Sequence, residues 1–298
     1  MANSKFDSGF SKKPGRLERM INKDGSFNVT KLGTKFSVRD LFQYFINLRW
    51  FQFNLLVIGF YFVINILFAL VYWLFDCSIV GSDPETHGFL TSFFFSVQTF
   101  TTLGYGTLSP GDITTNLLAS FESFAGLLSF ALATGLLYGK FSKPRARIRF
   151  SQIALIRPFK EGQALMFRLA NERTNVLTNM HARVIASYFD KETGKRGFKE
   201  LSLETSEILY FPLNWTVVHE IKEDSPFYGL SHEEIIDQNF ELLITIKGYD
   251  DSYSADVRVQ SSYTADEFTF GKTFIPTFHY NEEGQIIMDI DKLDAIEV

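Results

Sequence analysis

The sequence predicts a chain of two unlike parts, a helical membrane part with two spanning helices and a β-sandwich that follows it. Two long apolar segments, residues 53–75 and 117–141, are each long enough to cross the ~30 Å hydrocarbon core of a bilayer. From about residue 150 onward, apolar and polar residues alternate in short runs between turn signals, as in sandwich strands. We expect three regions: an N-terminal segment (1–36), a transmembrane domain (37–150) and a β-sandwich domain (151–298).

Composition and charge limit the classes of function. The mean hydropathy of +0.02 averages an apolar part with a polar part. The net charge of −5 gives no indication of nucleic-acid binding. The single cysteine, Cys77, excludes an intrachain disulfide and a cysteine-based zinc site. The polar and basic residues 1–36 lack the apolar core of a signal peptide, so we expect the N-terminus to stay on the side of synthesis.

Residues 38–50 predict a short amphipathic helix in front of the first span. Leu41 and Phe45 belong to an apolar face, with polar residues opposite. The helix ends in Arg49-Trp50 and continues directly into the span. We therefore expect it to lie in the membrane interface, with an ordinary helix against a soluble domain as the alternative.

The distribution of charge predicts the orientation. Residues 76–116, between the spans, contain acidic residues and neither Lys nor Arg, whereas both outer flanks are basic. The positive-inside rule then places both termini in the cytoplasm and the connecting loop outside. We expect a multi-pass protein of the cell membrane, meaning the plasma membrane or a bacterial inner membrane.

The segment Thr101–Gly106 has the residue types of a potassium selectivity filter, in which backbone carbonyls replace the water shell of K⁺. Gly104 and Gly106 supply the positive-φ freedom that turns successive carbonyls toward one axis, and Tyr105 is expected to pack behind the pore. Residues 91–101 predict a pore helix whose negative end faces the cation. A chance glycine-rich turn does not explain this order of elements. The expected filter is Thr102, Leu103, Gly104, Tyr105 and Gly106, with K⁺ at Thr102, Leu103, Gly104 and Tyr105.

The second span carries one acidic residue and a row of residues at helical spacing. We expect Glu122 to lie behind the filter and support it by hydrogen bonds, the alternative being a position near the headgroups. Phe130, Thr134 and Tyr138 share one helical face. If that face lines a pore, these residues form a gate that closes by dewetting. The alternative is ordinary packing between helices.

A basic cluster follows the second span directly. It contains Lys140, Lys143, Arg145 and Arg147. Together with Arg49 and Trp50, it predicts binding of anionic phospholipid headgroups. A stop-transfer cluster that only determines the orientation explains the same residues equally well.

The remaining chain predicts strands and no catalytic site. We expect a turn at residues 247–250 and a short helix at 232–239 that begins after Ser231. The histidines are scattered, and there is neither a phosphate-binding loop nor a nucleophile motif, so we do not expect an enzyme. The expected strands are residues 164–169, 182–189, 207–213, 240–247 and 254–263.

The whole pattern resembles the inward-rectifier potassium channel (Kir) family, and specifically its bacterial KirBac type. The resemblance covers roughly residues 22–278, and its C-terminal segments are more specific than the filter, which many potassium channels share. The matching segments are Asp24-Gly25 with Asn28-Val29, Arg49-Trp50, Gln98–Gly106, Lys143–Ala146, Arg168–Asn171, Pro226–Gly229 and Ser262–Glu267.

The resemblance implies a homotetramer whose cytoplasmic immunoglobulin-like sandwich extends the pore. It implies passive K⁺ conduction that Ba²⁺ blocks and that lipid and the cytoplasmic domain gate, with a loop gate at about residues 249–256. Anionic phospholipid, including phosphoinositide, is the implied regulator, acting around Arg49 and residues 140–147.

Two departures and two alternatives remain. Strong rectifiers of this family carry an acidic residue on the second span. Phe130 stands at the corresponding position of this sequence, so we do not expect strong rectification. The extracellular cysteine pair of eukaryotic members is missing, because Cys77 stands alone. A membrane-anchored binding module without conduction would leave the filter motif unexplained. A weakly selective cation channel is disfavoured by the intact filter.

Overall fold

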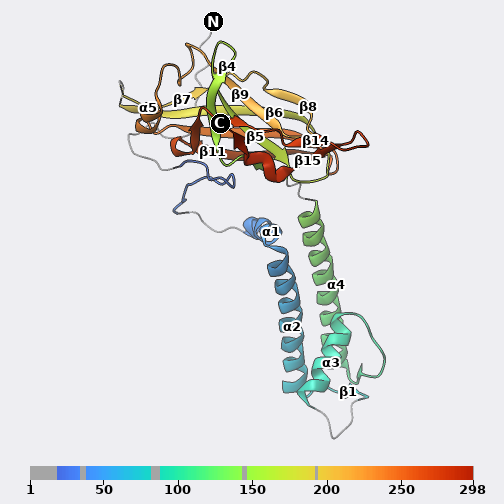
Figure 1. The fold of residues 1–298 in the computed structure, drawn as a ribbon. Helices are drawn as coiled ribbons and strands as arrows, with labels where there is room; N and C mark the ends of the chain where they lie inside the picture. Colours follow the sequence, from blue (N-terminus) through green and yellow to red (C-terminus); the bar gives the residue numbers. More distant parts are fainter. Residues whose placement is uncertain (1–18, 34–37, 82–87, 143–145, 192–193, 298) are drawn as a thin grey trace. The chain divides into compact units, whose positions relative to one another are not determined.

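The computed structural model describes residues 19–33, 38–81, 88–142, 146–191 and 194–297 (Figure 1). The described residues form two compact units, one helical, within residues 33–143, and one rich in strands. The strand-rich unit combines residues 144–298 with the N-terminal residues up to Leu32. The predicted class of two apolar spanning helices followed by a β-rich domain is confirmed.

The helical unit contains four helices and one short pair of strands. α2 (Trp50–Leu74) and α4 (Ile113–Phe141) are long and apolar enough to span a membrane. α1 (Val38–Asn47) precedes α2, and α3 (Phe89–Phe100) packs against both long helices. β1 (Ile79–Val80) pairs with β2 (Ser109–Pro110) and so joins the two ends of the segment between α2 and α4. Helices therefore form at all four places where the sequence predicts them, with boundaries shifted by a few residues. The interfacial position of α1 and the role of α3 as a pore helix stay predictions.

Two five-stranded sheets form the strand-rich unit and enclose one apolar core. One sheet has the order β11-β10-β6-β7, with β8 paired to β6. Its strands are β6 (Leu177–Asp190), β7 (Lys195–Glu200), β8 (Glu207–Tyr210), β10 (Glu241–Asp250) and β11 (Ala255–Thr264). The other has the order β12-β4-β5-β3, with β9 paired to β5. Its strands are β3 (Ile148–Phe150), β4 (Ala154–Phe159), β5 (Gly162–Asn171), β9 (Trp215–Ile221) and β12 (Phe268–Phe270).

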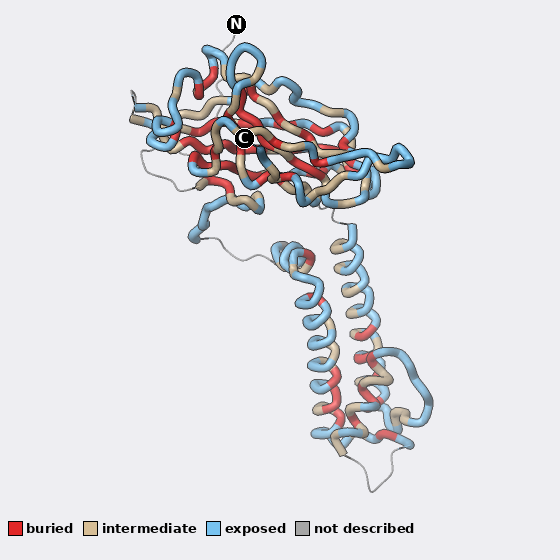
Figure 2. Tube along the Cα trace, in the orientation of Figure 1, coloured by how far each residue is buried: buried red, intermediate tan, exposed pale blue. Residues whose placement is uncertain are grey.

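Alternating side chains build the core between the sheets. Leu242, Ile244 and Ile246 of β10 are buried in it together with Leu165 and Phe167 of β5. Figure 2 shows the buried positions in red along the strands of this unit. The short elements at the edges are α5 (His232–Asp237), a 3₁₀ turn (Ala265–Glu267), β13 (Thr273–Phe274), β14 (Phe278–Tyr280), β15 (Ile286–Met288), a 3₁₀ turn (Ile290–Asp294) and β16 (Ile296–Glu297).

Most predicted strands are confirmed, but the turn expected at residues 247–250 is wrong. β10 continues to Asp250 through a β-bulge at Gly248. A Cβ atom at Gly248 would collide with Met180 Sδ, so the glycine provides space between paired strands. The predicted helix after Ser231 is confirmed as α5, and Ser231 caps it by accepting a hydrogen bond from the Glu234 backbone N–H at 3.3 Å.

The N-terminal residues from Arg19 to Asn28 are bound to the sheet that contains β10. The backbone N–H groups of Met20 and Ile21 donate to Glu241 Oε1, at 2.8 Å and 3.3 Å. Arg19 pairs with Glu267 at 2.6 Å. These contacts attach part of the region expected as a separate segment, residues 1–36, to a strand more than two hundred positions later in the sequence. The boundary expected near residue 150 stays a prediction.

Candidate functional site

The backbone after α3 alternates in handedness. Thr102, Gly104 and Gly106 have φ values of +56°, +54° and +82°, whereas Leu103 and Tyr105 between them do not have positive φ. Such alternation turns successive carbonyls toward the same side, as a ring of cation-binding oxygens requires. The sequence pointed to this conformation at the two glycines, but it gave no sign of it at the β-branched Thr102.

The end of α3 fixes where this segment begins. The carbonyl of Gln98 accepts hydrogen bonds from the backbone N–H groups of Leu103 and Gly104, at 2.9 Å and 3.4 Å. Thr101 caps the helix and donates its hydroxyl to the Val97 carbonyl at 2.7 Å. The C-terminal end of α3, which carries negative partial charge, therefore leads directly into the alternating segment.

The side chains of the expected filter segment are largely uncovered in a single chain. Leu103 is 52% exposed and Tyr105 is 71% exposed. The predicted packing of Tyr105 behind the pore is thus not made within the chain. An aromatic ring of this size gains free energy when it is covered, so this surface is suited to contact with a second copy.

A buried polar network joins α2, α3 and α4. Tyr72 donates its hydroxyl to Glu122 Oε2 at 2.6 Å, and Ser96 donates to Glu122 Oε1. Asn65 Oδ1 lies 3.1 Å from the Ser96 hydroxyl, and Asn65 Nδ2 donates to the Tyr61 carbonyl at 2.7 Å. Glu122 is fully buried, as a polar group inside a membrane protein must be. Its hydrogen bonds come from Tyr72 on α2 and Ser96 on α3.

α4 approaches the last turn of α3 closely at one glycine. A Cβ atom at Gly126 would overlap the carbonyl of Phe100. One turn earlier, the Ser123 hydroxyl donates to the Thr99 carbonyl at 3.2 Å. These contacts hold the middle of α4 against the residues that lead into the alternating segment.

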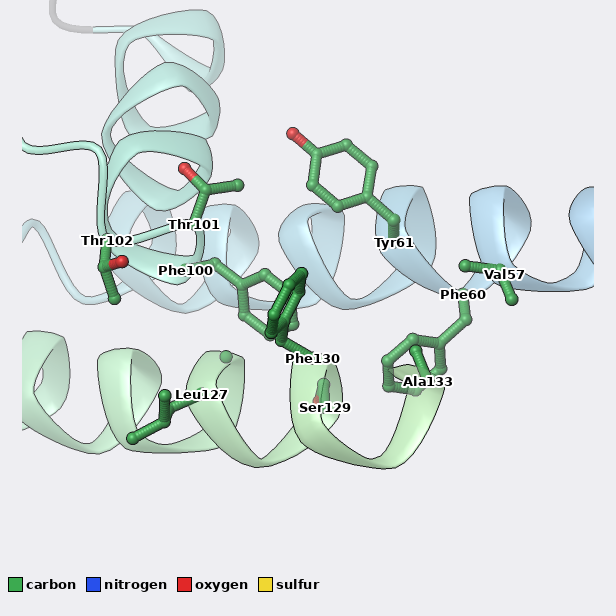
Figure 3. Close-up of a pocket in the computed structure, with 11 residues that line it drawn as sticks. Val57, Phe60, Tyr61, Phe100, Thr101, Thr102, Leu127, Ser129, Phe130 and Ala133 are labelled. Atoms are coloured by element: carbon green, nitrogen blue, oxygen red, sulfur yellow. The ribbon is translucent and has the colours of Figure 1, made fainter. Parts of the chain in front are cut away.

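The residues expected to form a gate lie on one exposed face of α4. Phe130 and Tyr138 are 74% and 73% exposed, and Thr134 between them is also exposed. Phe130 also borders an apolar cavity of about 430 Å³ between α2, the end of α3 and α4, together with Phe60 and Phe100 (Figure 3). The three residues therefore share one face of α4, as the sequence predicts, and this face is exposed in the single chain.

The expected lipid-binding residues fall into three groups. Arg49 and Trp50 lie exposed at the start of α2, and Arg147 pairs weakly with Glu172 at 3.9 Å. Lys143 and Arg145 lie outside the described residues. Lys140 is different, because its ammonium donates to the carbonyls of Ile46 and Leu48.

The histidines and acidic residues of the strand-rich unit form no metal site within its described residues. No three His, Cys, Asp or Glu side chains gather there as metal ligands. Buried His219 is held by the Ser202 carbonyl at 2.7 Å and the Ser225 hydroxyl at 2.8 Å, and burial lowers the pKa of its imidazole. These contacts explain His219 as a structural residue.

Comparisons with known proteins agree on one family. The family described as inward rectifier potassium channel C-terminal domain matches residues 148–298, and the family described as ion channel matches residues 60–143. The inward rectifier potassium channel Kirbac3.1 of Paramagnetospirillum magnetotacticum is 34% identical over 97% of this chain and 99% of the relative. The ATP-sensitive inward rectifier potassium channel 12 of Gallus gallus is 25% identical over 91% of this chain and 70% of the relative. The inward rectifier potassium channel 18 of Homo sapiens is 23% identical over 91% and 69%.

Proposed function

Because the chain belongs to the inward rectifier potassium channel family, we propose that Thr102–Gly106 is the selectivity filter of its pore. The chain is a membrane protein and a potassium-selective channel of the inward-rectifier type, and its family is not a family of enzymes. The observation that carries the filter assignment is the alternating backbone at Thr102, Gly104 and Gly106. No observation favours a membrane-anchored binding module.

The filter requires four copies of the chain. The carbonyls of Thr102, Leu103, Gly104 and Tyr105 from a homotetramer surround K⁺ and replace its water shell. Two observations support this assembly: the exposed ring of Tyr105, and the exposed face of α4 that carries Phe130, Thr134 and Tyr138. Ba²⁺, which has nearly the size of K⁺ and twice its charge, binds the same carbonyls and blocks conduction.

Glu122 supports the filter through the pore helix. Its carboxylate accepts hydrogen bonds from Ser96 on α3 and Tyr72 on α2. It therefore fixes the orientation of α3, whose Gln98 carbonyl in turn accepts hydrogen bonds from the N–H groups of Leu103 and Gly104. The filter keeps its shape because these contacts hold the pore helix in place.

Conduction is gated on α4 and regulated by lipid. Phe130, Thr134 and Tyr138 form the gate, in which the rings of Phe130 and Tyr138 narrow the pore and close it by dewetting. Phe130 carries no charge, so this span does not support strong rectification. Anionic phospholipids, including phosphoinositides, bind at Arg49, Trp50 and the basic cluster of Lys140, Lys143, Arg145 and Arg147. The β-sandwich domain, residues 151–298, extends the pore on the cytoplasmic side of the cell membrane, where both termini lie.

Flux through reconstituted protein tests these assignments. The full chain is placed in liposomes, and Rb⁺ or K⁺ uptake is compared with Na⁺ uptake, with and without Ba²⁺ and phosphoinositide. We expect uptake that favours K⁺ and is blocked by Ba²⁺, and a change in uptake when phosphoinositide is present. Equal Na⁺ and K⁺ uptake would remove the filter assignment. Unchanged uptake with phosphoinositide would remove the lipid assignment and leave the filter intact.

A further inference from the structure

Three basic side chains stand next to one another on the outer face of one sheet. In the strand register, Lys247 of β10 lies directly opposite Arg258 of β11 on one side and His181 of β6 on the other. All three are exposed, whereas the adjacent Ile246 and Val257 are buried in the core. Residues directly opposite on neighbouring strands have Cβ atoms about 4.5–5.5 Å apart. We call these three residues the basic row.

Carboxylates neutralise one end of the basic row and leave the other end uncompensated. His181 Nδ1 lies 3.1 Å from Glu207 on β8. Arg183, two residues further along β6, donates to both carboxylate oxygens of Glu200 on β7 at 2.7 Å. These carboxylates lie on the edge of β6 that faces away from β10. The two members of the row on β10 and β11 form no ion pair among the residues that the structure describes.

The sheet holds these two uncompensated cations close together. Like charges directly opposite on neighbouring strands repel each other and destabilise the sheet. The pairing of β10 with β11 continues on both sides of Lys247 and Arg258, so their backbones cannot separate to relieve the repulsion. Asp256, two positions from Arg258, stands opposite Tyr249 and not opposite either cation. A bound anion would remove the repulsion.

The arrangement suits a ligand with several phosphate groups. A guanidinium can donate two parallel N–H groups to phosphate oxygens, and an ammonium adds a compact positive charge. Thr245 and Gln260 form the next pair on this face of β10 and β11 and offer a hydroxyl and an amide beside the two cations. The row crosses three strands that lie about 5 Å apart. Linked phosphates can contact more of this length than a single phosphate can.

We propose that the basic row binds the phosphate groups of a multivalent anion, with Lys247 and Arg258 as the main contacts. His181 adds positive potential at the end that Glu207 partly neutralises. The site shares no residue with the basic cluster that follows the second span, and it requires neither the filter nor the gate. A free polyphosphate and a phosphorylated lipid headgroup carry the same chemistry, so the experiment has to distinguish them.

Calorimetric titration of the full chain with inorganic tripolyphosphate tests the site. The protein is kept in uncharged detergent micelles at an ionic strength of about 0.15 M, where weak surface attraction is screened. We expect the double variant Lys247→Gln with Arg258→Gln to bind about tenfold more weakly than the wild type, the effect of losing charged hydrogen bonds. Monophosphate should also bind the wild type more weakly than tripolyphosphate does.

Lys195→Gln is the matched control. It removes one exposed cation from β7 of the same sheet, away from the row. Its affinity for tripolyphosphate should stay within about twofold of the wild type, because a distant surface charge is screened. Thermal unfolding gives a second measurement: tripolyphosphate should raise the midpoint of the wild type and of Lys195→Gln. It should leave the midpoint of the double variant unchanged.

Competition in bilayers distinguishes the two sources of phosphate. The wild type is reconstituted in vesicles that contain phosphoinositide, or phosphatidylglycerol at equal surface charge, and is titrated with tripolyphosphate. Equal affinity in the two bilayers would assign the row to a free anion. Weaker binding of tripolyphosphate with phosphoinositide alone would assign the row to a lipid headgroup.

Three results would overturn the proposal. The first is a wild type that does not bind tripolyphosphate. The second is equal binding by the wild type and the double variant. The third is a loss of affinity in Lys195→Gln as large as in the double variant, because binding would then follow overall charge. Since these titrations need no conduction, they decide the proposal even if the proposed channel activity fails its own test.

Discussion

At the scale of the residue, the proposed filter segment, residues 102–106, depends on backbone conformations that most side chains avoid. Thr102 has a φ of +56°, although a β-branched residue in this region is strained by about 1–3 kcal/mol. The two hydrogen bonds that Leu103 and Gly104 donate to the Gln98 carbonyl hold the chain in this turn. These hydrogen bonds, from the two residues after Thr102 to a carbonyl before it, hold Thr102 in its strained conformation.

Gly104 should not tolerate a side chain. Its φ of +54° costs an alanine about 1–2 kcal/mol, and nothing nearby hinders a Cβ, so the effect arises from the backbone alone. We expect Gly104→Ala to lose most K⁺ flux or the preference for K⁺ over Na⁺, measured as Rb⁺ uptake with competing Na⁺. Gly59→Ala, at a helical glycine with open space around it, should leave both unchanged. Wild-type preference in Gly104→Ala would contradict the filter assignment.

Two glycines of α4 should respond differently to the same change. A methyl group at Gly126 overlaps the Phe100 carbonyl, whereas a methyl group at Gly135 meets no atom of the chain within 4 Å. We expect Gly126→Ala to displace α4 from the end of α3 and to lower flux at least tenfold. Gly135→Ala should retain a folded, assembled protein, checked by size-exclusion chromatography. Equal behaviour of the two variants would show that α4 does not rest on α3 at Gly126.

At the scale of the element, three helices are joined by one buried network. Removing the Tyr72 hydroxyl leaves a carboxylate oxygen of Glu122 without its donor, which costs about 1–3 kcal/mol for a buried group. We therefore expect Tyr72→Phe to lower the midpoint of thermal unfolding by several degrees and to reduce K⁺ preference. Tyr44→Phe, at an exposed tyrosine of α1, serves as the matched control. An unchanged unfolding midpoint in Tyr72→Phe would mean that the network does not support the helices.

The elements that the sequence predicted well are those with a strong local pattern. The spans follow from long apolar segments, and α5 follows from Ser231 and Glu234, which form a capping box. Gly248 misled the prediction, because a glycine that makes room for Met180 in a paired strand looks like a turn in the sequence. β4 and β9 were missed, since their pattern is understood only once the pairing with β5 is known.

The sequence predicted the backbone conformation of the candidate site much better than the side-chain contacts around it. The glycines of the proposed filter segment are visible in the sequence, but the donors to Glu122 come from positions 26 and 50 residues away. The contacts of Lys140 could not be predicted from the sequence either. A basic residue at the end of a span indicates lipid, and only the folded chain brings the carbonyls of Ile46 and Leu48 to its ammonium.

At the scale of the whole molecule, the N-terminal residues are held by one buried carboxyl group. Glu241 accepts the N–H groups of Met20 and Ile21 and lies 3.7 Å from Arg196, and burial raises the pKa of its carboxyl group. The folded chain then binds the proton more tightly than the unfolded chain does. The stability that Glu241 contributes is therefore fully present below the unfolded pKa of ~4.3 and falls as pH rises toward the folded value.

Glu241→Gln should remove this dependence on pH. We expect the wild-type attachment of residues 19–28, followed by hydrogen–deuterium exchange, to loosen as pH rises from the unfolded pKa through the acidic range, after correction for the intrinsic exchange rate. In Glu241→Gln the slope should be flatter, because glutamine does not titrate while its carbonyl can still accept the two N–H groups. An equal slope in the two proteins would mean that Glu241 does not cause the dependence on pH.

The proposed assembly of four copies can be tested by mixing intact and defective subunits. If every tetramer shares one filter, a defective Gly104→Ala subunit damages the whole pore in which it assembles. Coexpression of equal amounts of tagged Gly104→Ala and wild-type chains should leave only about one sixteenth of the tetramers fully wild type, so K⁺-selective uptake should fall far below half. Mixing the two proteins after separate purification keeps the wild-type tetramers intact and should give half the uptake, which controls for dilution. If the coexpressed sample also shows half of the wild-type uptake, each chain acts alone. That result would contradict a filter shared by four chains.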